Sequence, residues 1–242
     1  MQCQRTILFC LLSVAAGLGA PAVAAPGTGT HAPEPRLIVK LSHGSNGSVA
    51  VNKDGSLLIR PSNQTDWISA SLPRTLFFRS VAFGNDVHVA VGGSYMRAGP
   101  TLAITADGRH WRFPRLPSAH VLQAIAFHEG QFRAVGDEGI ILTSTDGRHW
   151  RKSVTPTAED LMGIAAAGQT WVAVGRNGSI ITCVGASSWS KWSHPNGCGL
   201  GAVVWTGQIF EARSYRREIF RSANGHEWEH QEPASRALSR NE

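Results

Sequence analysis

The stretch Ala124–Trp150, AIAFHEGQFRAVGDEGIILTSTDGRHW, decides the fold because its pattern returns at a fixed interval. Gly163–Trp189 reads GIAAAGQTWVAVGRNGSIITCVGASSW, and Ala202–Trp228 repeats the same pattern more loosely. One constant interval (150 − 111 = 189 − 150 = 228 − 189 = 39) separates the tryptophans Trp111, Trp150, Trp189 and Trp228. Trp67 precedes the first of them by a slightly longer interval (111 − 67 = 44). A period of roughly 40 residues indicates a repeat architecture.

Each unit divides into four short segments rich in Val, Ile, Phe and Trp, separated by Gly, Asn or Asp, which is the pattern of β-strands. In the central unit the expected strands include Ala124–Phe127, Phe132–Val135 and Ile140–Thr143, and the fourth begins at Trp150. Four-stranded units repeated at this period are typical of propeller blades. The sequence therefore predicts an all-β fold, a single β-propeller of about five four-stranded blades, over residues 36–233.

The N-terminal segment has the pattern of a signal peptide. Arg5 precedes an apolar run, Ile7–Leu18, and the small-residue exit Ala22-Val23-Ala24 follows. The alternative, a membrane anchor, is disfavoured because the run is too short to span a bilayer. We predict a signal peptide over residues 1–24, a flexible linker over 25–35, a disordered tail over 234–242, and a periplasmic or secreted protein without a transmembrane segment in its mature form.

Charge and cysteine content narrow the classes of partner. The formal net charge is +6, but no Lys/Arg run is dense enough to predict nucleic-acid binding. After removal of the leader only Cys183 and Cys198 remain, and they either form one disulfide in an oxidising compartment or stay separate as buried thiols. We favour the disulfide. No CxxC pair is present, so neither redox catalysis nor a thiolate zinc site is indicated. We predict no cofactor, no metal and a monomeric chain.

The turn before each tryptophan carries a recurring S/T-x-D-G-x-x-W motif. Its members are Thr105, Asp107, Gly108 and Trp111; Ser144, Asp146, Gly147 and Trp150; and, with Asn in place of Asp, Ser222, Asn224, Gly225 and Trp228. Asp can accept turn N–H groups, Gly supplies a positive φ, and the indole buries area between blades. The fourth unit lacks the motif, with Cys183, Gly185 and Ala186 in its place. These residues therefore predict structural turns.

This motif resembles the Asp-box of bacterial neuraminidase repeats, although it is one residue shorter than the usual form. The strings AVGDEGIILTSTDGRHW and AVGRNGSIITC also resemble the repeats of photosystem II assembly-factor propellers. The resemblance implies a propeller whose boxes lie at the periphery, away from any active site. His110 and His149 hold equivalent outer positions in different blades, so we interpret them as surface residues and predict no zinc site.

A candidate site follows from the one loop that breaks the period. The interval from Gly92 to Trp111 (111 − 92 = 19) is longer than the interval from Gly136 to Trp150 (150 − 136 = 14). Five extra residues therefore enlarge the loop between the second and third strands of the second unit. Tyr and Arg suit the binding of planar or anionic groups. From this loop and its equivalents we predict a ligand site for a protein partner or an acidic glycan, formed by Tyr95, Arg97, Asp137, Glu138, Arg176, Tyr215 and Arg216.

Two functional hypotheses follow, and neither assigns a catalytic residue. The first is an exported, non-catalytic scaffold that binds through the loops of one face. The alternative is an exo-sialidase-like glycoside hydrolase, which needs an arginine cluster, a Tyr nucleophile paired with Glu, and an acid/base Asp. Tyr215 with Arg97, Arg176 and Arg216 imitates part of that set. No Glu is identifiable as the partner of Tyr215, and sialidase catalytic domains have six blades, so we favour the scaffold.

Overall fold

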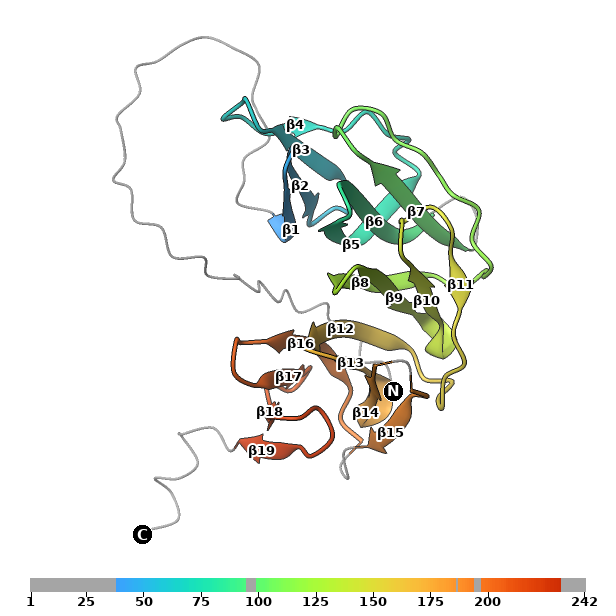
Figure 1. The fold of residues 1–242 in the computed structure, drawn as a ribbon, viewed down its shortest axis with the longest axis vertical. Helices are drawn as coiled ribbons and strands as arrows, with labels where there is room; N and C mark the ends of the chain where they lie inside the picture. The colour runs from blue at the N-terminus through green and yellow to red at the C-terminus, as the bar shows by residue number, and fades with distance from the viewer. Residues whose placement is uncertain (1–37, 95–98, 186, 194–196, 232–242) are drawn as a thin grey trace, which may run out of the picture.

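A computed structural model of the chain describes residues 38–94, 99–185, 187–193 and 197–231. These residues form five antiparallel sheets that follow one another around an arc (Figure 1). The prediction of an all-β propeller of about five blades is therefore confirmed. The predicted leader, linker and tail lie outside the described residues. Among the described residues, no helix has the length and apolar character needed to cross a lipid bilayer.

Each sheet is one blade, and its strands pair in the order of the sequence. The first blade contains β1 (Ile38–Gly44), β2 (Gly47–Asn52), β3 (Leu57–Pro61) and β4 (Ile68–Ser69), and the second contains β5 (Leu76–Gly84), β6 (Val87–Ser94) and β7 (Pro100–Thr105). The third contains β8 (Leu122–His128), β9 (Gln131–Gly136), β10 (Ile141–Ser144) and β11 (Arg151–Lys152). The fourth contains β12 (Leu161–Ala167), β13 (Thr170–Gly175), β14 (Ser179–Val184) and β15 (Ser190–Ser193). The fifth contains β16 (Leu200–Trp205), β17 (Phe210–Ser214), β18 (Ile219–Ser222) and β19 (Glu229–Gln231).

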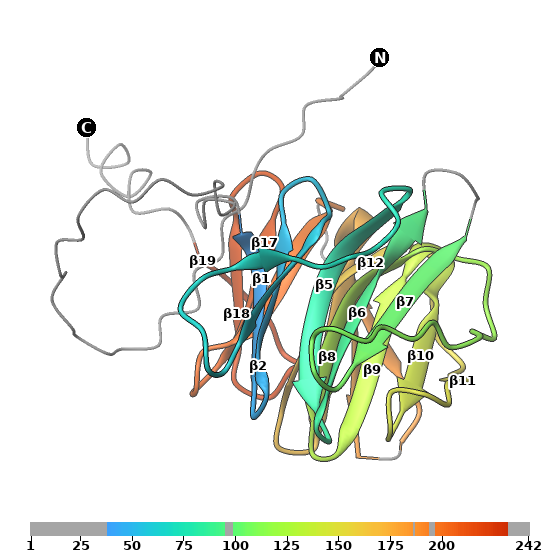
Figure 2. The same cartoon turned by 90° about the horizontal axis from the view of Figure 1, so that it is seen from above.

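The first strand of every blade lies on the inner side of the arc. Contacts run from β1 to β5, from β5 to β8, from β8 to β12 and from β12 to β16, so that each blade packs on the next (Figures 1 and 2). Within the described residues no comparable contact joins the first blade to the fifth. The arc is therefore open between these two blades, which the repeat pattern did not reveal.

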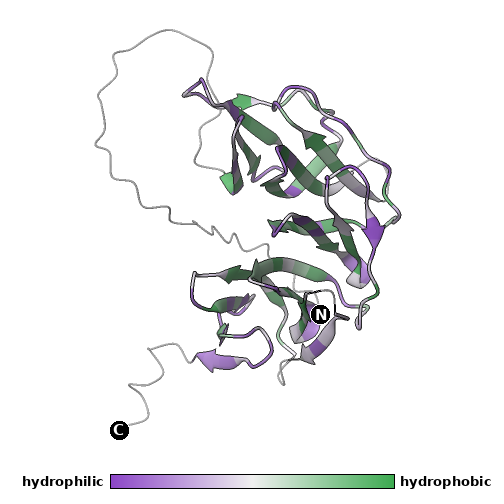
Figure 3. Cartoon of the chain, in the orientation of Figure 1, coloured by the Kyte–Doolittle hydropathy of each residue, from purple (hydrophilic) through white to green (hydrophobic). Residues whose placement is uncertain are grey.

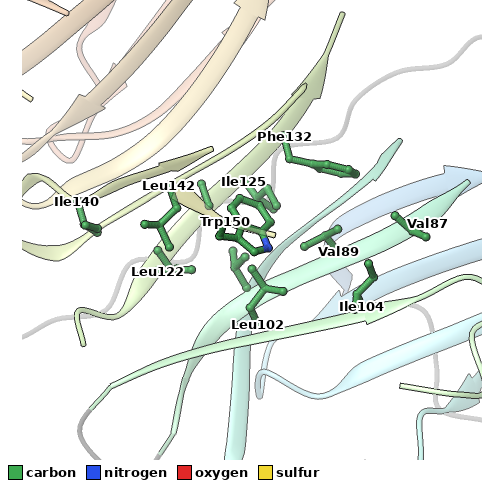
Figure 4. Packing of buried hydrophobic residues seen from close by; sticks show 12 residues of the cluster. Val87, Val89, Leu102, Ile104, Leu122, Ile125, Phe132, Ile140, Leu142 and Trp150 are labelled. Atoms are coloured by element: carbon green, nitrogen blue, oxygen red, sulfur yellow. The ribbon is translucent and has the colours of Figure 1, made fainter. Parts of the chain in front are cut away.

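The cores of the molecule lie between blades rather than within them. Between the second and third blades, Val89 and Leu102 face Phe132, Leu142 and Trp150, all of them buried (Figure 4). Burial of one large aliphatic or aromatic side chain stabilises a fold by about 1.5–3 kcal/mol. Alternate residues of a strand point to opposite faces, so a central strand must be apolar on both faces to serve two neighbours. Figure 3 shows hydrophobic colour on the inner and central strands, whereas the outermost strands β11 and β19 are hydrophilic.

The second blade departs from the predicted four strands. The segment that begins at Trp111 makes a single bridge instead of a fourth strand, in which Ile104 and Arg112 exchange two backbone hydrogen bonds of 2.9 Å. Pro114 and Pro117 follow directly, and proline has no N–H to continue a ladder. The fourth strand of this blade therefore ends almost where it begins.

The predicted disulfide is not formed in this structure, where Cys183 and Cys198 are buried, free thiols. In the fourth blade, Ser179 pairs with Ser193 at one end of the sheet, and Cys183 lies four positions further along β14. Four strand residues span about 13 Å. Cys198 follows Ser193 at the opposite end of the blade, whereas a disulfide needs Cα atoms within about 7 Å. The alternative of two separate buried thiols is the one that the structure shows.

The turns before the tryptophans make the same set of hydrogen bonds in the second, third and fifth blades. In the third blade Ser144 Oγ accepts the Gly147 N–H at 2.9 Å, and Asp146 Oδ1 accepts the Arg148 and His149 N–H groups at 2.8 Å. The indole of Trp150 donates to the Gly147 carbonyl at 2.7 Å. Burial would raise the pKa of Asp146, but the bonds from the His149 backbone and ring hold that pKa well below its ordinary range.

Candidate functional site

A β-bulge recurs at the same point of the innermost strand in every blade. The pairing register shifts by one residue there. One residue of each inner strand is therefore left without a pairing partner on the second strand: Val39, Arg79, Gln123, Met162 and Gly201. Bulges redirect a side chain and are common next to functional sites. The backbone approaches closely at this point, since a Cβ on Gly136 would lie 2.0 Å from the Val121 carbonyl oxygen. The bulges thus place one residue of variable type per blade at the same end of the inner strands, and in the fifth blade this residue is a glycine without a side chain.

The loops between second and third strands add a row of side chains beside these bulges. Asp137, Arg176 and Tyr215 hold equivalent positions in the third, fourth and fifth blades. Each donates its backbone N–H to a carbonyl just before the inner strand of its own blade, with distances of 3.0 Å to Val121, 2.9 Å to Asp160 and 3.1 Å to Gly199. The bonds anchor the three loops in the same way. The same backbone arrangement therefore carries a carboxylate in the third blade, a guanidinium in the fourth and a phenol in the fifth.

Asp160 joins the loops of the third and fourth blades. Its Oδ1 atom accepts the Glu138 N–H at 3.0 Å, and its Oδ2 atom lies 2.9 Å from Arg176 Nε. The Arg176 side chain remains 64% exposed, so the ion pair is worth less than about 1 kcal/mol to stability. Most of the guanidinium edge of Arg176 is therefore still available to a ligand.

Tyr215 lies across the start of β16 because two glycines leave room for its ring. A Cβ on Gly201 would lie 2.9 Å from Tyr215 Cε1, and one on Gly199 would lie 3.2 Å from Cδ2. Tyr215 is nevertheless 45% exposed. Burial raises the pKa of Tyr215, while the positive charges of Arg176 and Arg79 act in the opposite direction. The phenol therefore stays protonated near neutral pH and offers both a donor and an acceptor.

We call this group the channel-end site. It consists of Arg79, Gln123, Asp137, Asp160, Arg176 and Tyr215, contributed by the second, third, fourth and fifth blades. Gln123 Nε2 donates to Asp137 Oδ1 at 2.7 Å, which orients both side chains. The Arg79 guanidinium lies 4.9 Å from the centre of the Phe77 ring and is exposed. The site combines two accessible cations with an amphipathic ring and an oriented amide, a set suited to carboxylate and main-chain recognition.

The structure brings together part of the site that the sequence predicts. Asp137, Arg176 and Tyr215 belong to the channel-end site, and Glu138 reaches it through its backbone N–H. The Glu138 carboxylate itself lies 3.7 Å from His120 Nδ1. Arg216 follows Tyr215 in the same loop, where its N–H bonds to Ser214 Oγ at 3.1 Å. Tyr95 and Arg97, the two residues predicted from the enlarged loop, lie outside the described residues.

Sequence reasoning missed Arg79, Gln123 and Asp160, although a signal for the first two was present. Gln123, Met162 and Gly201 each precede the tryptophan of their blade by the same interval (150 − 123 = 189 − 162 = 228 − 201 = 27). Arg79 precedes Trp111 by a longer interval (111 − 79 = 32), which is the same position after allowance for the insertion in the enlarged loop. Arg79 is the one charged residue in this series. Asp160 has no comparable signal because its role depends on contacts with two loops.

The described residues contain no group of three His, Cys, Asp or Glu side chains arranged to hold a metal ion. Comparison of the sequence with protein-family models and with curated proteins gives no match. Several solved structures share the fold. YCF48 bound to a D1 peptide superposes with a TM-score of 0.61 at 20% identity, over 81% of this chain and 67% of the other. YCF48 from Cyanidioschyzon merolae gives a TM-score of 0.59 at 15% identity, over 80% and 69% of the two chains.

The WD40 repeats of RRP9 give a TM-score of 0.59 at 8% identity, over 80% of this chain and 65% of the other. These identities are low, so the likenesses show the β-propeller fold and leave activity and partners open.

Proposed function

We propose that this chain is a non-catalytic binding scaffold that holds an extended segment of a partner protein at the channel-end site. The observation that carries the proposal is that Arg176 and Tyr215, from neighbouring blades, both lie against Gly199, while the positive charge of Arg79 acts on the same phenol. Four blades contribute to the site, so a bound segment would contact several rigid frames at once. Sites built on strand ends and short anchored loops lose little entropy on binding.

The charges define which segment fits. Arg79 and Arg176 are both exposed, and the only carboxylate that pairs with either of them in the described residues is Asp160. A ligand carboxylate would therefore find an unfilled guanidinium edge, where charge-assisted bonds are about twice as strong as neutral ones. Tyr215 supplies a flat apolar surface beside them. The fit is to an acidic segment or a free C-terminal carboxylate, and a related fold, YCF48, has been seen with a bound peptide.

The test compares a short acidic peptide that has a free C-terminus with the same peptide amidated and with its acidic residues changed to amides. Fluorescence polarisation should show saturable binding of the first peptide only. Arg79→Ala and Arg176→Ala should each weaken it about tenfold, since each removes a charge-assisted contact. Arg148→Ala is the matched control, because Arg148 is an exposed arginine on the tryptophan-side turn of the third blade. Equal binding of all peptides would refute the proposal.

An acidic glycan is the alternative occupant of the same site, because its carboxylates would use the same arginines. A titration with uronate oligosaccharides distinguishes the two: stronger binding of glycan than of peptide would favour a lectin-like role. The sialidase hypothesis has less support. Burial raises the pKa of Tyr215, which disfavours a tyrosinate nucleophile, and the carboxylate that acts on it is Asp160 rather than a Glu. A fluorogenic sialoside assay over several pH values tests it directly.

We further propose that the protein acts outside the cytoplasm, in the periplasm or the medium. The support is the leader pattern over residues 1–24 and the small-residue exit Ala22-Val23-Ala24. Mass spectrometry of the protein from each fraction of its native cell should give an N-terminus near Ala25 in the exported fraction. An intact N-terminus confined to the cytoplasm would refute this location.

A further inference from the structure

Arg133 is a buried cation at a position where three of the other four blades carry valine. It lies on β9, where the equivalent residues of the first, second and fourth blades are Val49, Val89 and Val172. Arg133 is only 8% exposed. A charge removed from water is costly unless it is paired or bound. The stability of this position therefore depends on the groups that surround the guanidinium.

The guanidinium of Arg133 is held by aromatic rings and neutral acceptors. Its carbon lies 4.7 Å from the centre of the Trp171 ring and 5.4 Å from that of Trp189. Nε donates to Gln131 Oε1 at 2.7 Å, and Nη2 donates to the Gly185 carbonyl at 3.4 Å. In the part of the chain that the structure describes, no carboxylate lies within ion-pair distance of Arg133, and Nη1 has no hydrogen-bond partner. The positive charge is thus oriented but not neutralised.

The facing blade departs from the repeat at the same seam. In the third and fifth blades the turn glycine packs on the valine of the preceding blade, with a Cβ on Gly147 placed 2.9 Å from Val89 and one on Gly225 placed 2.8 Å from Val172. The fourth blade, which faces Arg133, has lost that turn motif at Cys183 and Gly185. Two independent departures from the consensus therefore meet at one place.

A hollow opens at this seam. Its volume is about 600 Å³, within the range of small-molecule sites. Its walls combine hydroxyl groups with apolar surface, and the residues that matter here are Arg133, Thr143, Ser153, Thr155, Ser187 and Trp189. A second hollow of about 370 Å³ lies on the Trp171 side of Arg133 and includes Glu129. We call the larger one the seam pocket.

We propose that the seam pocket binds a small monocarboxylate, whose oxygens accept hydrogen bonds from the unfilled edge of the Arg133 guanidinium. The indole faces already contact the guanidinium, so the ligand must approach in its plane, where bidentate bonds to a carboxylate form. A single negative charge matches the single cation. A dianion such as phosphate would leave an excess negative charge against walls that carry no second cation. The apolar part of the ligand would lie along Val154 and Trp189.

The test uses the full chain labelled with 5-fluorotryptophan and followed by fluorine NMR. Acetate and benzoate are titrated against their neutral counterparts, acetamide and benzamide, with Trp171→Phe and Trp189→Phe used for assignment. The carboxylates should shift the Trp171 and Trp189 resonances saturably, and the amides should not. Arg133→Lys should weaken the binding about tenfold, because the ammonium lacks the planar fork. Arg151→Lys, on the exposed face of β11, is the matched control and should not change it.

Thr143→Val provides a second variant that leaves Arg133 and both tryptophans in place, and it should weaken binding severalfold through loss of one wall hydroxyl. Its use keeps the proposal testable even if Arg133→Lys does not fold. Shifts of equal size with benzamide and benzoate would overturn the proposal, as would the same benzoate affinity in wild type and Arg133→Lys. Saturable shifts confined to other tryptophans would also overturn it. None of these results depends on the channel-end site.

Discussion

The fourth and fifth blades share one repeat but differ in the face that each turns toward the next position of the arc. The fourth blade presents Val172, Val174 and Thr182, all of them buried where this blade meets the fifth. At positions equivalent to Val172, Val174 and Thr182, the fifth blade presents Glu211, Arg213 and Arg221. Arg213 Nη2 lies 2.7 Å from Glu211 Oε1, and Arg221 Nε lies 3.3 Å from Glu211 Oε2. The difference shows that charged residues make the outer face of the last blade polar, so that no further blade packs on it in the described part of the chain. The terminal repeats of solenoid proteins have polar outer faces for the same reason.

The first blade, at the other end of the arc, also has a cation over its apolar surface. Among the residues that the structure describes, no blade precedes the first, whose small apolar cluster contains Ala50, Leu58 and Trp67. The Arg60 guanidinium, from the same blade, lies 4.9 Å from the centre of the Trp67 ring. At the seam between the third and fourth blades, the cation over the indole comes from the neighbouring blade instead. Charged side chains therefore cover the outer face of the blade at each end of the arc. The first and fifth blades do not have to pack on each other to keep these faces from water.

The largest effect is expected for Val172→Glu, which places the glutamate found at the equivalent position of the fifth blade on the buried face between the fourth and fifth blades. Val172 is 0% exposed, and the buried carboxylate would have no cation beside it. We expect a loss of about 4 kcal/mol or more in the free energy of unfolding, measured by urea denaturation. Val172→Ala, a cavity control, should cost less. A loss below about 1 kcal/mol in the Glu variant would show that the fourth and fifth blades do not pack as described.

The reverse exchange is the variant Glu211→Val, Arg213→Val, Arg221→Thr, which gives the fifth blade the interior residues of the fourth. The chain should stay folded but expose a contiguous apolar sheet face, and such faces drive association. Sedimentation velocity should show a concentration-dependent larger species that the unaltered chain lacks at the same concentration. A variant that sediments like the parent chain would argue against charge as the terminator of the arc.

The turns offer a milder contrast, because the third blade uses Asp146 where the fifth uses Asn224. Hydrogen bonds lower the pKa of Asp146 in the folded chain, so its stabilisation is present above the ordinary carboxyl pKa and is lost as the pH falls toward the folded value. Asp146→Asn should cost about 1 kcal/mol at pH 7. It should also flatten the loss of stability between about pH 4.5 and 2. Thermal melts at each pH test this, and Asn224→Asp should steepen the same dependence.

The smallest effect is expected at the first blade. Arg60→Ala removes the cation over Trp67 but leaves the indole buried. We expect a loss of about 0.5–1 kcal/mol in the free energy of unfolding, typical of a partly exposed cation–π pair. Arg60→Met retains the apolar stem and serves as the control for packing. If Arg60→Met loses no stability, the charge of Arg60 contributes nothing at this position, and any loss in Arg60→Ala comes from the missing stem.

Much of the fold could be predicted from the repeat, whereas the site could be predicted only in part. Val, Gly and Trp recur at fixed offsets because each blade solves the same packing problem, so the strand order and blade count are legible. The loops around Asp137, Arg176 and Tyr215 were identified for the same reason. Arg79 was missed because its importance comes from a bulge, and a register shift is decided by pairing between strands rather than by either strand's residues.

The sequence by itself determined the local structure of this protein: most of its strands, the positions of its turns, and the tryptophans that pack between blades. These choices depend on neighbours that lie within a single repeat of the chain. Only the tertiary structure decided that Cys183 and Cys198 stay apart, that the arc is open, and that the charge of Arg79 acts on Tyr215. Each of these depends on the relative placement of different blades or of opposite blade ends, and that placement is set by the summed packing of whole sheets rather than by any local pattern.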